Sequence, residues 1–379
     1  MTIKRFIAGS YRTVKEKVCM ALFRILPVNK KRIMFMSHYG KHINCNPYAI
    51  YTRMKEKNMD YEYIWVDNSK RTPEKSVKYR SVRFYYYLRT SGVLVFNARP
   101  NIDIKKRNNQ FYVQTWHASL GLKMIEKNAV DSLVPKYVKR SIKDSTYINV
   151  LVSGSEFQTS TFKEDFWYDG FIASTGTPRN DVLFSPNAKQ IIEDTKKEIG
   201  VKSDEKIFLY APTFRSNGDI SYALSMDPSE LSTALTERFG GDWRIVYRLH
   251  PNVVLPEGAI DGSVINATSY SDAQGLIMAA DILVTDYSSI MFDYMLLNKP
   301  VLLYCPDLED YVKNERRTNF KIEELPFSLS RSNGDLVAAI KHFNNVEYCE
   351  KAAELLKIIG SYEDGNASER IIKIISDRI

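Results

Sequence analysis

The chain has 379 residues, of which 44% are hydrophobic and 26% charged, a composition typical of a folded protein that excludes a disordered or collagen-like one. This length exceeds one ordinary hydrophobic core, so two domains are expected. The net charge is +8, but residues 1–32 carry nine basic residues and one acidic residue, so the rest is neutral and offers no basic body for nucleic acid.

The cysteines indicate neither a zinc site nor a disulfide framework, because they are scattered and form no Cys-x-x-Cys pair. Their positions are Cys19, Cys45, Cys305 and Cys349. A reduced, cytosolic compartment fits this pattern.

Residues 1–30 predict a basic amphipathic helix. Apolar residues recur there at spacings of three and four: Ile3, Ile7, Tyr11, Val14, Val18, Leu22 and Ile25. No apolar run approaches the ~20 residues that span a bilayer, and the spread of the cations argues against a signal peptide. The pattern favours a helix lying on an anionic membrane surface, and the alternative is a helix packed on the body with a solvated basic face.

Apolar runs alternate with helical patterns along the rest of the chain, which predicts two α/β domains with parallel sheets. In residues 31–185 the runs are Ile33–Met36, Tyr63–Val66, Val93–Phe96, Phe111–Gln114, Asn149–Val152 and Ile172–Ala173. In residues 186–345 they are Ile207–Tyr210, Arg244–Tyr247, Val264–Ala267, Ile282–Val284 and Val301–Tyr304. Ser185–Asp204 is expected to be a helical linker, and residues 346–379 are expected to be helices that could pack back on the first domain.

The stretch from Ala280 to Asp310 predicts a βαβ unit with parallel strands. Asp286, Ser288 and Ser289 follow its first strand, at the sheet edge where ligands bind in such folds. The serines stand at the start of a helix, where N–H groups and hydroxyls can hold an anion. The alternative is that one serine is only an N-cap.

Two earlier strand ends of the second domain add polar residues: Thr213 with Arg215, and Arg248 with His250. Together with the serines they favour a nucleotide-diphosphate site. Surface ion pairing would also explain the arginines, and fixing of a turn would explain the histidine. If the carboxyl edges of both sheets face each other, these residues line a single cleft.

In the first domain, His117 follows a strand and precedes Ser119 and Lys123. A histidine in a cleft can take a proton from an attacking hydroxyl, although a lone histidine is more often structural. His38 is a weaker candidate of the same kind. A phosphate-loop ATPase, a nicotinamide enzyme and a two-carboxylate Mg²⁺ site are disfavoured, because none of their motifs occurs.

The motifs along the chain resemble those of the CDP-glycerol glycerophosphotransferase family, the teichoic acid primases and polymerases. They are Asn46-Pro-Tyr-Ala-Ile-Tyr51, Gln114-Thr-Trp-His117, Gly176-Thr-Pro-Arg-Asn-Asp181, Tyr210-Ala-Pro-Thr-Phe-Arg215, Arg248-Leu-His-Pro251, Ile282-Leu-Val-Thr-Asp-Tyr-Ser-Ser-Ile-Met-Phe-Asp293, Asp307-Leu-Glu-Asp-Tyr311 and Ser361-Tyr-Glu-Asp-Gly-Asn-Ala-Ser368. The resemblance covers nearly the whole chain, in order.

The resemblance implies a GT-B fold of two Rossmann-like domains, associated with the cytoplasmic side of the membrane and using CDP-glycerol. No cofactor or metal is expected. An acceptor hydroxyl would attack the β-phosphorus, and CMP would leave. His117 would be the general base, and His250 would stabilise the transferring phosphate. By the same resemblance the diphosphate would be held by Arg215, Ser288 and Ser289, the nucleotide side would be shaped by Asp286 and Asp293, and the acceptor side would include His38, Ser119, Lys123 and Arg179.

The sequence departs from the family pattern after His117, where Ala118-Ser119-Leu120 replaces Gly-Thr-Pro, and at Thr177, Arg316-Arg317 and Phe327. These positions belong to the expected acceptor and glycerol region. The acceptor is therefore open, between wall teichoic acid and a capsular or other surface polymer. Alternatives are a CDP-ribitol transferase, a GT-B glycosyltransferase using a nucleotide sugar, and a catalytically silent membrane-bound scaffold.

Overall fold

The structure is a computed structural model that describes residues 3–69, 74–215, 218–250, 253, 258, 262–314 and 317–378. The chain forms two compact units. The first consists of Met1–His117, Leu133–Asp181 and Tyr362–Ile379, and the second of Ala118–Ser132 and Val182–Ser361. The chain therefore passes between the units four times, after His117, Ser132, Asp181 and Ser361.

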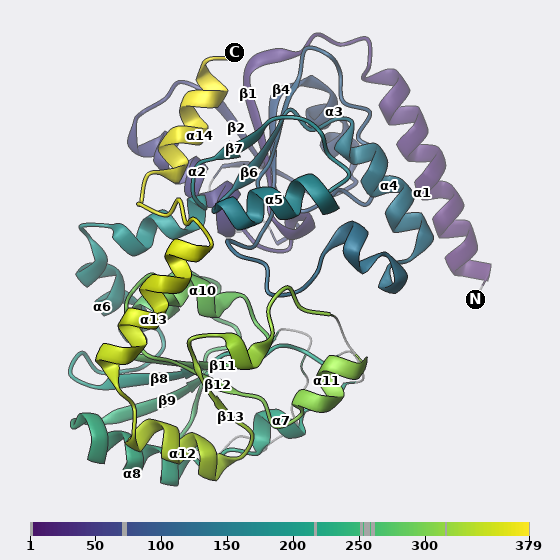
Figure 1. Cartoon of the computed structure of the whole chain (residues 1–379). Coiled ribbons are helices and arrows are strands. Elements are labelled where there is room, and N and C mark those ends of the chain that lie inside the picture. Colours follow the sequence, from purple (N-terminus) through teal and green to yellow (C-terminus); the bar gives the residue numbers. More distant parts are fainter. Residues whose placement is uncertain are drawn as a thin grey trace. The chain divides into compact units, whose positions relative to one another are not determined.

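The described part of the first unit contains a parallel seven-stranded sheet in the order β3-β2-β1-β4-β5-β6-β7 (Figure 1). The strands are β1 (Asn29–Met36), β2 (Glu62–Val66), β3 (Lys75–Val77), β4 (Ser91–Phe96), β5 (Phe111–Gln114), β6 (Val150–Ser153) and β7 (Ile172–Ser174). Since β1 and β4 are neighbours and the chain proceeds outward from each, the topological switch point lies between them.

Helices cover both faces of this sheet. They are α1 (Ile3–Leu22), α2 (Cys45–Glu56), α3 (Val82–Thr90), α4 (Pro135–Ser145), α5 (Glu156–Asp165) and α14 (Ala367–Ser376). Ile33 and Phe35 point to the same face because they are two residues apart in a strand. There they pack with Met54 of α2 and with Ile371 and Ile375 of α14, all buried. The C-terminal helix thus completes the core of the first unit.

The described part of the second unit repeats the arrangement with six parallel strands in the order β10-β9-β8-β11-β12-β13. The strands are β8 (Lys206–Tyr210), β9 (Trp243–Tyr247), β10 (Ile265–Asn266), β11 (Ile282–Thr285), β12 (Val301–Tyr304) and β13 (Ser328–Ser330). The helices are α6 (Ala188–Glu198), α7 (Ser221–Leu224), α8 (Pro228–Phe239), α9 (Ala273–Ala279), α10 (Ile290–Met295), α11 (Leu308–Asn314), α12 (Asn333–Lys341) and α13 (Asn345–Ile358). Here the switch point lies between β8 and β11.

The two predicted parallel α/β sheets are confirmed, as is the βαβ unit, in which β11 and β12 pair in parallel on either side of α10. The edge strands β3 and β13 were not predicted, because three residues of mixed polarity leave no periodic signal. The expected group of C-terminal helices is divided, since α13 belongs to the second unit and α14 to the first.

Candidate active site

At the switch point of the first unit, His38 follows β1 and Asn97 follows β4. The backbone N–H of His38 donates to Oδ1 of Asn97 at 2.9 Å, and Nδ2 of Asn97 lies 3.2 Å from Nε2 of His38. Because an amide nitrogen can only donate, Nε2 of His38 accepts and the proton of the neutral ring is on Nδ1. Asn97 therefore fixes the tautomer of His38.

His117 joins the same cluster from the end of β5. Its Nδ1 lies 3.0 Å from the backbone oxygen of Asn97, and its ring centroid is 5.8 Å from that of His38. A carbonyl oxygen can only accept, so Nδ1 of His117 carries the proton and Nε2 keeps a lone pair. That is the tautomer a general base requires.

The backbone before His117 is held in an unusual conformation. Trp116 has φ +50, in the left-handed region, and its backbone N–H donates to Oε1 of Gln114 at 3.0 Å. Asn46 donates from Nδ2 to the carbonyl oxygens of Thr115 at 3.1 Å and Trp116 at 3.0 Å. The turn that presents the imidazole is thus fixed from both sides.

Arg179 completes the cluster. Its backbone N–H donates to Oδ1 of Asn46 at 3.0 Å, and its Nη1 donates to the carbonyl oxygen of His117. The structure therefore brings three predicted site residues together within the first unit: His38, His117 and Arg179. Sequence reasoning missed Asn46 and Asn97 as site residues. Their signal was available, because Asn46 opens one of the matched motifs and Asn97 directly follows a predicted strand.

Burial, with the nearby charges of Arg179 and Lys41, lowers the pKa of His38 from its ordinary 6.5 to about 4. As the pH falls, His38 therefore binds a proton near pH 6.5 in the unfolded chain but only near pH 4 in the folded chain. We expect this residue to remove about 2 kcal/mol of stability as the pH falls from 8 to 5. The measurement is urea unfolding of the wild type and His38→Gln at both pH values; equal losses in the two proteins would contradict it.

Ser119 and Lys123 do not lie where the sequence suggested. Both belong to the second unit, because the chain after His117 pairs with the segment around Thr318. Ser119 is buried and its hydroxyl donates to Oδ1 of Asp293, while Nζ of Lys123 lies 5.5 Å from the ring of Tyr311.

In the second unit, Arg215 is buried between two carboxylates. Its Nη2 lies 2.8 Å from Oδ2 of Asp286, and its Nε lies 2.6 Å from Oδ2 of Asp307. Burial lowers the pKa of this guanidinium, but the two carboxylates outweigh it and raise the pKa. Arg215 is only 3% exposed and Asp286 is fully buried, so protein groups surround both side chains in this structure.

This ion cluster supports the loop after β11. The rings of Tyr287 and Tyr311 stack with centroids 3.5 Å apart, and the guanidinium carbon of Arg215 lies 5.0 Å from each ring. Oδ1 of Asp286 also accepts the backbone N–H of Thr213 at 2.8 Å. The ends of β8 and β11 are therefore locked together, and the side chain of Thr213 remains half-buried.

Ser288 and Ser289 are half-buried at the start of α10, which is only six residues long. So short a helix has a small dipole, and an anion here would depend on the hydroxyl and amide groups themselves. Ser288 is also a weak cap, since Oγ lies 3.4 Å from the N–H of Ile290. Asp293 is 3% exposed, and its carboxylate accepts hydrogen bonds from Ser119 and Gln274.

Arg248 and His250 follow β9. Nη1 of Arg248 donates to the carbonyl oxygen of Tyr270 at 2.7 Å, and no carboxylate among the described residues pairs with this guanidinium. Burial lowers its pKa. His250 is exposed, with its ring 5.4 Å from that of Phe214. Pro251 and Arg316, from the motifs above, lie outside the described residues.

Comparison with known proteins places the whole chain in one family. Residues 18–377 match the model of the CDP-Glycerol:Poly(glycerophosphate) glycerophosphotransferases. The chain is 29% identical to a teichoic acid poly(glycerol phosphate) polymerase of Bacillus spizizenii, covering 98% of this chain and 99% of that protein. It is 30% identical to the teichoic acid glycerol-phosphate transferase of Staphylococcus aureus, covering 99% and 98%.

A solved structure of the wall teichoic acid polymerase TagF, a histidine variant soaked with CDPG, superposes with a TM-score of 0.82 at 27% identity and covers 100% of this chain and 98% of that one. By contrast, the chain spans only about half of two other poly(glycerol phosphate) polymerases, from Bacillus subtilis and Staphylococcus epidermidis. Among the described residues, no group of three or more His, Cys, Asp or Glu side chains is placed to hold a metal ion.

The family model and these relatives agree along the chain. The chain belongs to the CDP-glycerol:poly(glycerophosphate) glycerophosphotransferase family.

Proposed function

We propose that this protein transfers glycerol phosphate from CDP-glycerol to a hydroxyl group of a membrane-linked acceptor in the synthesis of teichoic acid or a related surface polymer. The acceptor oxygen forms a bond to the β-phosphorus, and the bond from that phosphorus to the oxygen bridging the two phosphates breaks. CMP leaves with the electron pair, and the acceptor carries a new phosphodiester. The observation that carries the proposal is the family match over residues 18–377, joined to the base-competent tautomer of His117.

In this reaction Nε2 of His117 takes the proton of the attacking hydroxyl. The hydrogen bond from Nδ1 to Asn97 stabilises the imidazolium that forms, because the donor strengthens as the ring gains charge. Arg248 and His250 neutralise the diphosphate of the donor, with Thr213, Ser288 and Ser289 as hydroxyl donors. Arg215, Asp286 and Asp293 position these groups from below the surface. The same strand order in both sheets supports a GT-B type fold.

The decisive assay incubates the purified protein with a lipid-linked saccharide acceptor and follows release of CMP. CDP-glycerol is expected to give CMP, and CDP-ribitol is the matched donor because some relatives are ribitol-phosphate polymerases. A nucleotide sugar is the third donor. The proposal fails if CDP-glycerol gives no CMP with any acceptor and does not bind by calorimetry. Product from CDP-ribitol alone would change the donor, and product from the sugar alone would change the reaction class.

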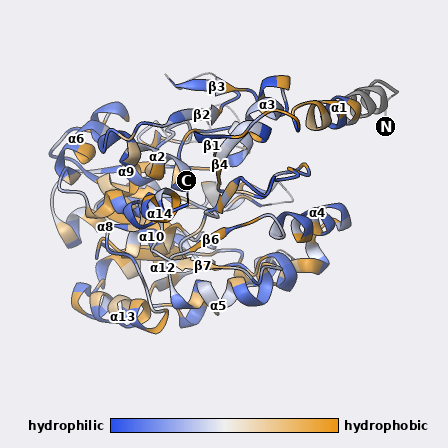
Figure 2. Cartoon of the chain, turned by 90° about the horizontal axis from the view of Figure 1, so that it is seen from above, coloured by the Kyte–Doolittle hydropathy of each residue, from blue (hydrophilic) through white to orange (hydrophobic). Residues whose placement is uncertain are grey.

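We further propose that α1 attaches the protein to the cytoplasmic face of an anionic membrane. One side of the helix packs on the body: Met20 is buried, the rings of Phe23 and Tyr86 lie 5.6 Å apart, and Glu16 pairs with Arg80 at 2.8 Å. The side predicted to be apolar stays exposed, with Val14, Val18, Leu22 and Ile25 at 59%, 57%, 57% and 81%. Figure 2 shows hydrophobic and hydrophilic residues along the described length of the helix. The side chains of Ile3, Ile7 and Tyr11 lie outside the described ones.

Two expectations were given for residues 1–30, contact with a membrane and packing on the body of the protein. One side of the helix packs on the body, and we propose that the other side contacts the membrane. Within the described residues, no helix is long and apolar enough to cross a bilayer. The same helix carries the exposed basic residues Arg12 and Lys17, and Arg24 follows it; together with the exposed apolar stripe they suit insertion at an anionic lipid surface.

Replacing Val14, Val18 and Leu22 together by serine is expected to lower binding to anionic liposomes by about 100-fold, since each side chain contributes about 1 kcal/mol at the interface. Packing on α3 is retained because these residues face away from it. The control is Val346→Ser on α13, which is 67% exposed and outside this stripe. Sedimentation with vesicles at low and high salt measures the effect; unchanged sedimentation of the triple variant would reject the membrane role of the stripe.

A further inference from the structure

A pocket of about 410 Å³ lies at the edge of the first sheet opposite to His117 and Asn97. Its floor is made where strands begin, by Lys30 of β1, Gly92 of β4, Phe111 of β5 and Val150 of β6. The strands approach closely here, because a Cβ on Gly92 would meet the backbone of Lys30 at 2.7 Å. Its volume is in the range of small-molecule sites.

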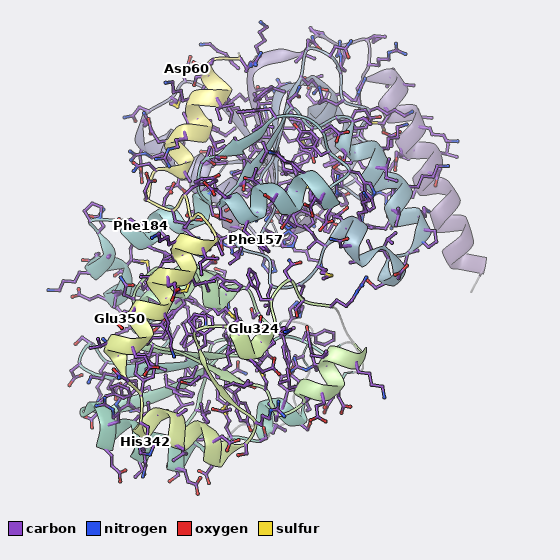
Figure 3. The ribbon with its side chains drawn as sticks, in the orientation of Figure 1. Asp60, Phe157, Phe184, Glu324, His342 and Glu350 are labelled. Atoms are coloured by element: carbon purple, nitrogen blue, oxygen red, sulfur yellow. The ribbon has the colours of Figure 1, made fainter. Side chains whose placement is uncertain are left out.

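Among the described residues, two cations and no carboxylate line this pocket. Lys30 and Arg378, near the end of the chain beyond α14, are both exposed, and neither has an ion-pair partner among the described residues. Their neighbours behave differently: Lys31 pairs with Asp60 at 2.6 Å, an aspartate labelled at the surface in Figure 3, and Arg32 pairs with Glu62 at 2.6 Å. Among the consecutive cations Lys30, Lys31 and Arg32, only Lys30 lines the pocket, and it is the one without a carboxylate partner among the described residues.

The remaining lining offers hydrogen bonds and aromatic surface. Asn108 and Asn109 are exposed and make no hydrogen bond within the described part of the chain, and Asn149 uses its Oδ1 on the N–H of Tyr112 while its Nδ2 stays available. Phe171 borders the pocket with 59% of its surface exposed. Amides suit hydroxyl groups, and an aromatic face suits the C–H side of a polyol or sugar.

We propose that this pocket binds a small polyol phosphate or sugar phosphate, at a site separate from the one that contains His117. Lys30 and Arg378 hold the phosphate, the asparagines bond the hydroxyl groups, and Phe171 covers the carbon chain. The two positive charges of a lysine and an arginine match the two negative charges of a phosphate better than the one negative charge of a carboxylate. The site does not depend on the transferase reaction, and it would be present even if the donor were not CDP-glycerol.

The test titrates the intact protein with glycerol 3-phosphate, inorganic phosphate and glycerol by calorimetry, and maps the bound state by hydrogen exchange. Glycerol 3-phosphate is expected to bind more tightly than phosphate and to protect residues 108–111 and 374–378. The variant Lys30→Gln with Arg378→Gln should weaken it by at least about tenfold, since both charged partners of the phosphate are lost. CDP-glycerol binding should be unchanged.

The matched control is Lys31→Gln with Lys75→Gln, which removes two paired cations of the same unit and should keep the affinity within about twofold. Phe171→Ala should reduce the preference for glycerol 3-phosphate over phosphate. The proposal is overturned if neither phosphate binds, if both double variants bind equally well, or if protection falls elsewhere. Equal affinity for phosphate and glycerol 3-phosphate would overturn the polyol part.

Discussion

Replacing His117 by alanine is expected to lower the turnover of CDP-glycerol by about 10²–10⁴-fold, the usual contribution of a general base. The reason is geometric: Asn97 holds Nδ1 of the ring at 3.0 Å, which leaves Nε2 as the acceptor for the proton of the attacking hydroxyl. Binding of CDP-glycerol should change little, because the residues proposed to hold the diphosphate belong to the second unit. CMP release and calorimetry on the same preparation separate the two effects.

The control for this variant is His342→Ala. His342 is exposed at the end of α12, as Figure 3 shows, and is outside every site residue named above. It should keep turnover within about twofold, as expected for a surface substitution. If His117→Ala kept more than a tenth of wild-type turnover, a base other than His117 would be required. If it lost both turnover and donor binding, His117 would act on the donor rather than on the acceptor hydroxyl.

The sheets could be read from the sequence because their strands are buried on both faces. Ile33–Met36 and Val93–Phe96 are continuous apolar runs, as parallel strands covered by helices require. The rule that ligands lie at the carboxyl ends of such strands then selected His38, His117 and Arg215 correctly as strand-end residues. This rule does not give the order of the strands in the sheet. It therefore could not show that Asn97, after β4, lies beside His38, after β1.

The side chains at those strand ends were harder to assign, because burial depends on partners far along the chain. Arg215 is neutralised by Asp307, 92 residues later, and Ser119 is occupied by Asp293, 174 residues later. A strand-end arginine with such a partner looks the same in sequence as one that binds phosphate. In the structure, Arg215 differs from Arg248 by its ion pairs with Asp286 and Asp307 and by its packing against two tyrosine rings.

This distinction predicts opposite effects for the two arginines. Arg215→Met leaves Asp286 buried without its cation, and breaking such a buried pair is expected to remove about 3–5 kcal/mol of stability. Arg248→Met removes one hydrogen bond to Tyr270, so its stability loss should be about 1 kcal/mol. The affinity for CDP-glycerol should instead fall by about 10- to 100-fold in Arg248→Met, because a charged partner of the diphosphate is lost.

Hydrogen exchange of the amides in β8 and β11 reports the stability of the second unit directly, and calorimetry reports the affinity of whatever protein remains folded. Arg331→Met is the control, since its ion pairs with Glu309 and Glu323 are long and half-exposed and should contribute little. If the Arg215→Met protein showed wild-type hydrogen exchange but did not bind the donor, Arg215 would contact the substrate directly and would not have a positioning role. Wild-type affinity in Arg248→Met would remove Arg248 from the diphosphate site and leave His250 and the hydroxyl groups of Thr213, Ser288 and Ser289 to hold the donor.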